Sequence, residues 1–292
     1  MKIMPRAHRN FLDLNSTLDF SDCFHDMTPG YVWHITHHCH KQEFLLKFCK
    51  DRRRWLHWLF EAKKRYGLRV LNYVITSNHV HLLVLDTGGD VISKSMQLIA
   101  GRTAWEYNAR KGRKGAYWED RYHATAVDTD EHLFSCMVYI DMNMIRAGVV
   151  GHPEEWLHGG YREIQVSPQR YRIIDVTLLM KLCGVEDRRE LQTQRRLWVE
   201  NELVRGVQAR DDMWTRSIAV GSKSFVERLN NTFALISRSG KIIEQDGKYI
   251  LKDCPGRYNA VFGGKKCSLS LENTVKLDIF LLFINKLSWS DP

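Results

Sequence analysis

The spacing of apolar residues divides the first part of the chain into short elements. A run of aromatic and β-branched residues predicts a first strand, and a longer stretch with helical spacing, stopped by Gly67, predicts a helix. Two runs rich in Val, Leu and Ile follow, and the turn residues Thr76-Ser77-Asn78 between them indicate a hairpin. The predicted elements are a strand over 31–36, a helix over 43–66 and strands over 68–75 and 79–85.

Residues 90–147 add a helix, a strand and a second helix to the predicted elements. The second helix is well marked, because Asp128 and Glu131 fit a capping box and Gly148 stands just past the end. The predicted elements are a helix over 90–110, a strand over 121–127 and a helix over 128–147. Strand, helix, strand, strand, helix, strand is the order of the ferredoxin-like α+β fold, an antiparallel sheet with helices on one face. We expect the opposite face to be open for a ligand.

The remainder of the chain predicts a mainly helical accessory region. Helical patterns cover 176–182 and 188–206, a helical pair is predicted over 213–236, and the residues beyond 240 suggest short strands or loops. We place a domain boundary near Ser167-Pro168. The expected organisation is an N-terminal extension over 1–30, a main domain over 31–166 and a C-terminal accessory domain over 167–292.

Composition indicates a globular protein with a basic balance. Of the 292 residues, 44% are hydrophobic and 26% are charged, and the net charge is +9. The first ten residues lack the apolar segment of a secretory signal, and the apolar run 279–284 is too short to cross a membrane, so we expect a cytoplasmic protein. Seven scattered cysteines without C-x-x-C spacing favour reduced, mostly buried thiols over a zinc or redox motif.

Basic residues gather in three groups within the first 115 residues, near 50–54, 63–65 and 110–114, and tryptophans stand among them. Each group alone is typical of a solvated helix face. Together with the net charge they favour a surface that follows nucleic-acid phosphates. The candidate nucleic-acid contacts are Arg52, Arg53, Lys63, Arg102, Arg110, Lys111, Arg113, Arg121 and Trp118.

The hairpin carries the first candidate for chemistry, His79-Val80-His81. Side chains at i and i+2 of a strand point to the same face, so both imidazoles can approach one metal ion while Val80 points into the core. A bare His-x-His is more often a pair of surface or hydrogen-bonded histidines.

The helix over 128–147 carries the second candidate. Tyr139 and Asn143 are four residues apart and therefore share a helix face, and Asn143 can offer a carbonyl oxygen to a hard divalent cation. A tyrosine in the core or at an interface is the alternative interpretation. A tyrosine hydroxyl, with a free pKa of about 10, needs help to attack a phosphodiester, and a divalent ion would spread the developing charge.

In this context the chain resembles a known family. Asn78-His79-Val80-His81-Leu82-Leu83-Val84 resembles the His-hydrophobic-His motif of HUH endonucleases. The stretch 139–148, Tyr-Ile-Asp-Met-Asn-Met-Ile-Arg-Ala-Gly, is similar to the tyrosine helix of single-tyrosine transposases, and Trp118-Glu119-Asp120-Arg121-Tyr122 adds a likeness to REP-associated tyrosine transposases. Two departures stand out: Met144 replaces a frequent proline, and Ser77-Asn78 replaces a Pro-Glu-like pair.

The resemblance implies a ferredoxin-like HUH domain that nicks or rejoins single-stranded, hairpin-bearing DNA with Mg²⁺ or Mn²⁺. Carried over residue by residue, it makes Tyr139 the nucleophile, His79 and His81 metal ligands, and Asn143 the third ligand. It leaves the oligomeric state open between monomer and homodimer. The alternatives are a non-catalytic single-stranded nucleic-acid-binding protein on the same fold and a metal-dependent hydrolase that uses activated water.

Several other residues have two interpretations each. The run His37-His38-Cys39-His40 favours DNA contact or a structural role over metal binding, because adjacent strand residues point apart. Arg146 is suited to phosphate or to the helix C-terminus. The segment Gly221-Ser222-Lys223-Ser224-Phe225 fits a helix cap. Aromatic residues that suit either base stacking or the core are Trp105, Tyr107, Trp118 and Tyr122.

Overall fold

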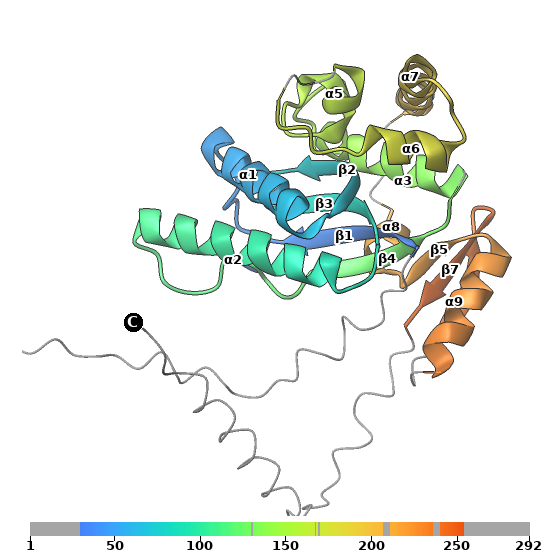
Figure 1. Cartoon of the computed structure of the whole chain (residues 1–292), viewed down its shortest axis with the longest axis horizontal. Helices are drawn as coiled ribbons and strands as arrows, with labels where there is room; N and C mark the ends of the chain where they lie inside the picture. The colour runs from blue at the N-terminus through green and yellow to red at the C-terminus, as the bar shows by residue number, and fades with distance from the viewer. Residues whose placement is uncertain are drawn as a thin grey trace, which may run out of the picture. The chain divides into compact units, whose positions relative to one another are not determined.

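The computed structural model describes residues 30–129, 131–166, 168, 170–206, 211–235 and 240–253. The first six major elements are β1 (Val32–His38), α1 (Cys49–Tyr66), β2 (Arg69–Ile75), β3 (His79–Leu85), α2 (Val91–Lys111) and β4 (His123–Val127). Their strands lie in the order β2-β3-β1-β4, and all neighbours are antiparallel. This order and the βαββαβ sequence define the ferredoxin-like fold, so the predicted fold is confirmed (Figure 1).

The start of the first helix differs from the prediction. The helix begins at Cys49 rather than near 43, after a 3₁₀ turn η1 (His40–Gln42) and an extended Phe48. Leu45 and Leu46 are buried from an irregular loop, where the backbone N–H of Leu46 donates to the carbonyl of Ser77 at 2.9 Å. The loop buries these two consecutive leucines and leaves Phe48 exposed, so the apolar residues before Cys49 do not form one helix face. The end of the helix is as predicted.

One face of the sheet is covered by α1 and α2, which lie side by side in Figure 1. His37 of β1 stacks on Trp118 with ring centroids 4.1 Å apart, and the Trp118 indole donates to the carbonyl of Ala100 in α2 at 3.1 Å. Val80 is the cross-strand partner of His37 and is fully buried on this face. The side chain between the two candidate histidines therefore belongs to the core, as strand alternation predicted.

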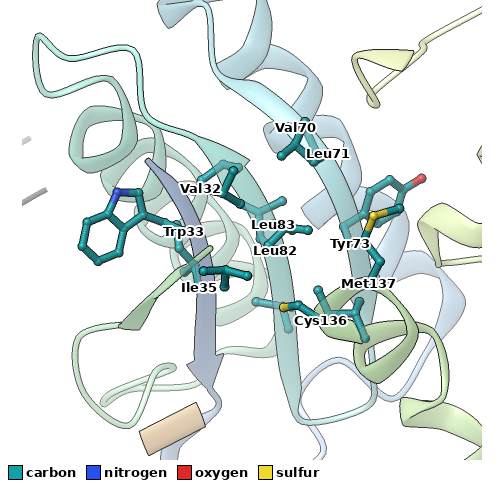
Figure 2. Close-up of a cluster of buried hydrophobic side chains, with 14 of the residues drawn as sticks. Val32, Trp33, Ile35, Val70, Leu71, Tyr73, Leu82, Leu83, Cys136 and Met137 are labelled. Atoms are coloured by element: carbon teal, nitrogen blue, oxygen red, sulfur yellow. The ribbon is translucent and has the colours of Figure 1, made fainter. Parts of the chain in front are cut away.

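The opposite face is covered as well, so the expected open face is wrong. It packs against α3 (Glu131–Asp141), α4 (Asn143–Arg146) and α8 (Met213–Arg216). Figure 2 shows Cys136 and Met137 of α3 beside the strands. Asn72 of β2 donates its side-chain amide to the carbonyl of Met137 at 3.3 Å. Strand patterns reveal which side chains share a face, but not that a segment far along the chain returns to cover it.

The predicted helix over 128–147 is two helices, because the chain breaks step at Met142, where ψ is −3°. Asp128 serves a different contact from the predicted capping box: its carboxylate accepts hydrogen bonds from the backbone and hydroxyl of Ser222. Ser222 in turn accepts from the backbone of Phe225 at 3.3 Å, so the predicted cap in this segment is confirmed.

The C-terminal residues extend the sheet. β5 pairs with β4 in parallel, and the seven strands lie in the order β2-β3-β1-β4-β5-β7-β6. The helices predicted over 176–182 and 188–206 and the strands beyond 240 are confirmed, whereas the helical pair over 213–236 contains a strand. The additional elements are η2 (Pro153–Glu155), α5 (Gly160–Gln165), α6 (Val176–Cys183), α7 (Arg188–Arg205), β5 (Ala219–Gly221), α9 (Lys223–Leu235), β6 (Lys241–Gln245) and β7 (Lys248–Lys252).

The described residues up to 253 form one compact unit. The boundary placed near Ser167-Pro168 stays a prediction, and the N-terminal extension lies outside the described residues except for Gly30. One buried ion pair joins the two sides of that boundary: Arg195 of α7 contacts Asp141 of α3 at 2.6 Å. Within the described ranges, no helix is both long and apolar enough to cross a membrane.

Candidate active site

His79 and His81 lie side by side on β3. Their ring centroids are 4.9 Å apart and the rings are nearly perpendicular, at 87°. His79 is partly exposed near the start of the strand, and its ring stacks on that of His38, its cross-strand partner. His81 is fully buried. Strand alternation thus brings both imidazoles to one face. Unlike a pair of surface histidines, this pair has one member that is fully buried.

The proton position on His79 follows from its neighbours. Its Nδ1 lies 2.7 Å from Oδ1 of Asn78 and 3.0 Å from the hydroxyl of Thr76. That hydroxyl donates its own hydrogen to the carbonyl of His79 at 2.8 Å, so it accepts from the ring. Two acceptors at Nδ1 place the proton of a neutral ring there. Nε2 is then the nitrogen with the lone pair, the form that a metal ligand requires.

His81 contacts three other side chains through its two ring nitrogens. Its Nδ1 lies 2.9 Å from Nε2 of His34 and 3.3 Å from the hydroxyl of Thr36, both on β1. Its Nε2 lies 2.9 Å from the side-chain amide nitrogen of Asn143, which donates to it. The predicted third ligand therefore meets the second histidine directly, across the contact between strand and helix.

His34 is fully buried and hydrogen-bonds through both ring nitrogens. Its Nδ1 lies 2.8 Å from the backbone carbonyl of Trp214, in α8. Burial lowers the pKa of His34 to about 3, against the opposing effect of the hydrogen bond to Trp214, and the nearby His123 lowers it further. The ring is neutral at physiological pH.

Tyr139 faces these histidines from α3. Its ring stands edge-on to that of His81 with centroids 5.8 Å apart, and to that of His34 at 6.0 Å. Only 6% of the residue is exposed. The Trp214 indole lies tilted against the ring at 6.2 Å.

Arg146 of α4 contacts both the ring and the backbone of Tyr139. Its guanidinium lies 4.4 Å from the centroid of the Tyr139 ring and donates to the Tyr139 carbonyl at 2.5 Å. The break at Met142 lets a residue seven positions on fold back over the ring. Of the two roles predicted for Arg146, service to the helix backbone is the one that the hydrogen bond supports.

A cavity of about 930 Å³ adjoins Tyr139. Its walls come from α3, α4, α7, α8 and the β6–β7 hairpin, so most of it is built by the C-terminal region. The lining includes two tryptophans and equal numbers of basic and acidic side chains. These residues are Trp198, Trp214, Arg146, Arg205, Lys248, Lys252, Glu202, Asp211, Asp212 and Asp246.

The fold brings Tyr139, His79, His81 and Asn143 together, but the predicted basic contacts lie elsewhere. Arg52 is buried and donates to the carbonyls of Leu46 and Lys47 at 2.8 and 2.7 Å, which closes the loop before α1. Lys63 donates to the carbonyl of Ile173 at 2.8 Å. Both cations hydrogen-bond the protein's own backbone, and their contact with nucleic acid stays a prediction.

Other predicted contacts also have partners within the protein. Arg110 forms an ion pair with the buried Asp51, and Arg113 donates to the carbonyl of Ala116 at 2.7 Å. Trp118 is packed between His37 and α2 rather than presented to a base. The exposed candidates are Arg53, Arg102, Arg110, Lys111 and Arg121.

The histidine run on β1 is mainly structural. Burial lowers the pKa of His37 to about 4, although its hydrogen bond to the carbonyl of Asp120 opposes this. Cys39 is buried, which raises the pKa of its thiol to about 12. Among the residues that the structure describes, no group of three or more His, Cys, Asp or Glu side chains is arranged to hold a metal.

Sequence reasoning missed His34, Thr36 and Trp214. A signal existed for the first two, since residues 34 and 36 alternate along the predicted first strand and must share a face. Their contact with His81 depends on the strand register, in which Thr36 pairs with His81. No signal in the sequence connects Trp214 to residues about 180 positions earlier.

Comparisons with known proteins agree with the predicted resemblance. The family model for transposases of the IS200-like type matches residues 29–143. A REP-associated tyrosine transposase bound to a REP hairpin is 17% identical, with a TM-score of 0.41 over 51% of this chain and 90% of that one. A candidate transposase from Deinococcus radiodurans R1 is 15% identical, with a TM-score of 0.30 over 42% and 93% of the two chains. A comparison with curated proteins gives no match.

The segment that matches the family model contains all four residues of the candidate site. The matched segment begins just before β1 and ends at Asn143, so it contains both histidines, the tyrosine and the amide that meet in the fold. It covers less than half of the 292 residues and stops before α5 to α9. This segment, which forms the ferredoxin-like domain, is similar to transposases of the IS200-like family.

Proposed function

We propose that the protein is a metal-dependent single-stranded DNA endonuclease and strand transferase with Tyr139 as its nucleophile. The observation that carries the proposal is the meeting of α3 with β3: His81 contacts the Asn143 amide at 2.9 Å while Tyr139 stands edge-on to the same imidazole at 5.8 Å. Tyr139 is buried in the hydrophobic core, but its ring also faces two histidines and lines a large cavity.

His79, His81 and Asn143 fit a divalent cation such as Mg²⁺ or Mn²⁺. The hydrogen bonds at Nδ1 leave Nε2 as the basic nitrogen in both rings, and rotation of the Asn143 amide exchanges its nitrogen for its oxygen. Three protein donors leave coordination positions for water and phosphate. A bound ion would neutralise charge on the scissile phosphate.

In the proposed reaction the Tyr139 oxygen loses its proton and bonds to phosphorus, while the bond from phosphorus to the 3′ oxygen breaks. The 3′ oxygen takes up a proton, so the products are a 5′-phosphotyrosine and a free 3′-hydroxyl. Attack of a 3′-hydroxyl on the phosphotyrosine reverses these changes and joins the strands. Arg146, which lies over the ring, orients Tyr139 throughout.

The proposed substrate is single-stranded DNA with a hairpin, from the family resemblance. Phosphates approach through the cavity beside Tyr139, where Arg146 and Lys248 stand in the walls.

The test is formation of a covalent adduct. End-labelled single-stranded oligonucleotides with hairpins are incubated with the protein and Mn²⁺ and resolved on a denaturing gel. We expect a labelled band at the mass of the protein plus the strand, with loss of both the band and the nick in Tyr139→Phe. Tyr66→Phe, at the end of α1, is the matched control and should nick normally.

Two other outcomes would overturn the proposal. Cleavage without an adduct in the wild-type protein would indicate a hydrolase that uses activated water. Binding without cleavage across hairpin sequences and metals, unchanged in Tyr139→Phe, would indicate a non-catalytic nucleic-acid-binding protein.

A further inference from the structure

A chain of hydrogen bonds runs from the C-terminal region into the candidate metal site. It starts at the backbone carbonyl of Trp214 in α8, passes through the imidazole of His34 on β1 and ends at His81 on β3. All three residues are almost fully buried. The 180 positions between His34 and Trp214 show that the connection is a product of the fold.

The Trp214 carbonyl fixes the proton of His34. A carbonyl oxygen can only accept, so Nδ1 of His34, 2.8 Å away, must donate. A neutral imidazole carries one N–H, and a fully buried ring without charge compensation is neutral. Nε2 of His34 is therefore an acceptor.

The acceptor nitrogen of His34 determines which ring nitrogen of His81 carries the hydrogen. Its Nδ1 lies 2.9 Å from the acceptor nitrogen of His34, and two lone pairs would repel at that distance, so Nδ1 of His81 carries the hydrogen. The hydroxyl of Thr36, 3.3 Å from the same nitrogen, is compatible as a second acceptor. Nε2 of His81 is left with the lone pair, and it points toward Asn143, which donates its amide hydrogen to it at 2.9 Å.

From this geometry we infer that His34 is a positioning residue, which, with the Trp214 carbonyl, locks His81 into the tautomer whose Nε2 can bind a cation. The inference rests on the proposed function for the identity of the site, but it concerns the proton on His81 rather than the cleavage of DNA. It also assigns a role to the C-terminal region. The domain that matches the family ends at Asn143, and the anchor of the chain comes from beyond it.

Asymmetry between the two candidate ligands supports the inference. His79 obtains the same tautomer from local partners, Thr76 and Asn78, which belong to its own hairpin. His81 is buried in the middle of the sheet, where no turn can supply an acceptor. A distant residue must do so, and metal-ligating histidines generally donate their other N–H to such a partner.

The first test needs no variant and no metal. Long-range ¹H–¹⁵N correlation spectra of the full chain, labelled with ¹⁵N-histidine, distinguish a ring protonated at Nδ1 from one protonated at Nε2. We expect Nδ1–H for both His34 and His81 at neutral pH. A His81 ring that carries its proton on Nε2 in the metal-free wild-type protein would overturn the inference.

Two substitutions then separate positioning from packing. His34→Gln keeps one donor and one acceptor on a side chain of similar length, whereas His34→Leu removes both. We expect His34→Leu to weaken Mn²⁺ binding, measured by electron paramagnetic resonance with the metal alone, by about 10- to 100-fold, the usual effect of losing such a partner. His34→Gln should restore most of the affinity and keep Nδ1–H on His81.

The outcomes distinguish this inference from the proposed function. A folded His34→Leu protein that binds Mn²⁺ like the wild type contradicts positioning. If His34→Leu does not fold, a His34→Gln protein whose His81 is protonated on Nε2 contradicts it equally. Wild-type protein that shows the expected tautomers and binds Mn²⁺ but forms no DNA adduct would leave the positioning role standing while the proposed function fails.

Discussion

On the face of the sheet toward α2, β1 and β3 bury Ile35, Val80 and Leu82 among apolar side chains. On the face toward α3, the same two strands bury His34, Thr36 and His81. Both sets of side chains are buried, but only the second consists of groups that must find hydrogen bonds. One face of the sheet is thus a structural core and the other carries the candidate site. Neighbouring residues of each strand point to opposite faces, so a shift of one residue in strand pairing would exchange the two sets of side chains.

Positively charged residues also differ between the two faces of the sheet. The basic groups that are most evident in the sequence belong to α1 and α2, on the apolar side, and several of them hold the protein's own carbonyls or carboxylates. The cations beside Tyr139, such as Arg146 and Lys248, stand alone in the sequence. Charge density along a chain is therefore a weaker guide to a site than burial of polar groups on one face.

The largest effect should come from the proposed metal ligands on the polar face. His79→Ala and Asn143→Ala are each expected to reduce Mn²⁺-dependent nicking by at least about 100-fold, since they remove a donor that would help to neutralise the phosphate. His38→Ala, which removes a ring stacked on His79, should lower the rate by less than about tenfold. Rates of adduct formation under single-turnover conditions measure the difference. A His38→Ala defect as large as that of His79→Ala would place His38 in the site.

The next effect concerns the ion pair behind the polar face. Asp141→Ala leaves Arg195 buried without its carboxylate and removes the acceptor for Asn72, so the free energy of unfolding should fall by about 3–5 kcal/mol. Urea denaturation measures it. Arg65→Ala, in the exposed pair with Glu61, is the control and should cost less than about 0.5 kcal/mol. Equal losses in the two variants would mean that the buried pair does not join α7 to α3 in solution.

Two neighbouring arginines on α1, Arg52 and Arg53, allow a buried structural cation to be compared with an exposed one. Arg52→Met should lower the free energy of unfolding by about 2–3 kcal/mol, because two backbone carbonyls lose a charged donor, and leave DNA affinity unchanged. Arg53→Met, at an exposed position, should leave stability unchanged. If Arg53 contacts a phosphate, the slope of log affinity against log salt falls by about 0.7 for single-stranded DNA. The reverse pattern in the two variants would support the predicted role of Arg52.

The smallest expected effect is a pH dependence on the apolar face. The folded-state pKa of His37 is lowered to about 4, so the unfolded chain binds the proton first as pH falls below about 6.5. Stability is therefore full above that pH and is lost between about 6.5 and 4. Between pH 7 and pH 5 this residue should account for about 2 kcal/mol of the loss. His37→Gln, which keeps a donor for Asp120, should show a loss smaller by that amount in denaturation at the two pH values, and equal losses would contradict the assignment.

Much of the fold followed from residues near one another in sequence. Gly67 ends α1 with a φ of 74°, the left-handed conformation that glycine adopts most readily. The hairpin at Thr76-Ser77-Asn78 sets the register of β2 and β3, and alternation then places His79 and His81 together. Local errors had local causes: Leu45 and Leu46 are buried from an irregular loop rather than from a helix, and Met142 interrupted a helix without a proline or glycine to announce it.

The sequence by itself determined the order of the elements, the ferredoxin-like topology and the shared face of His79 and His81, because backbone geometry makes these properties of spacing. It also put Tyr139 one turn from Asn143. Only the tertiary structure decided that α3 and α8 close the polar face, that Arg52 and Lys63 bind the protein's own backbone, and that His34 connects Trp214 to His81. These contacts join residues whose separation in the chain carries no periodic signal, and their partners are fixed by packing alone.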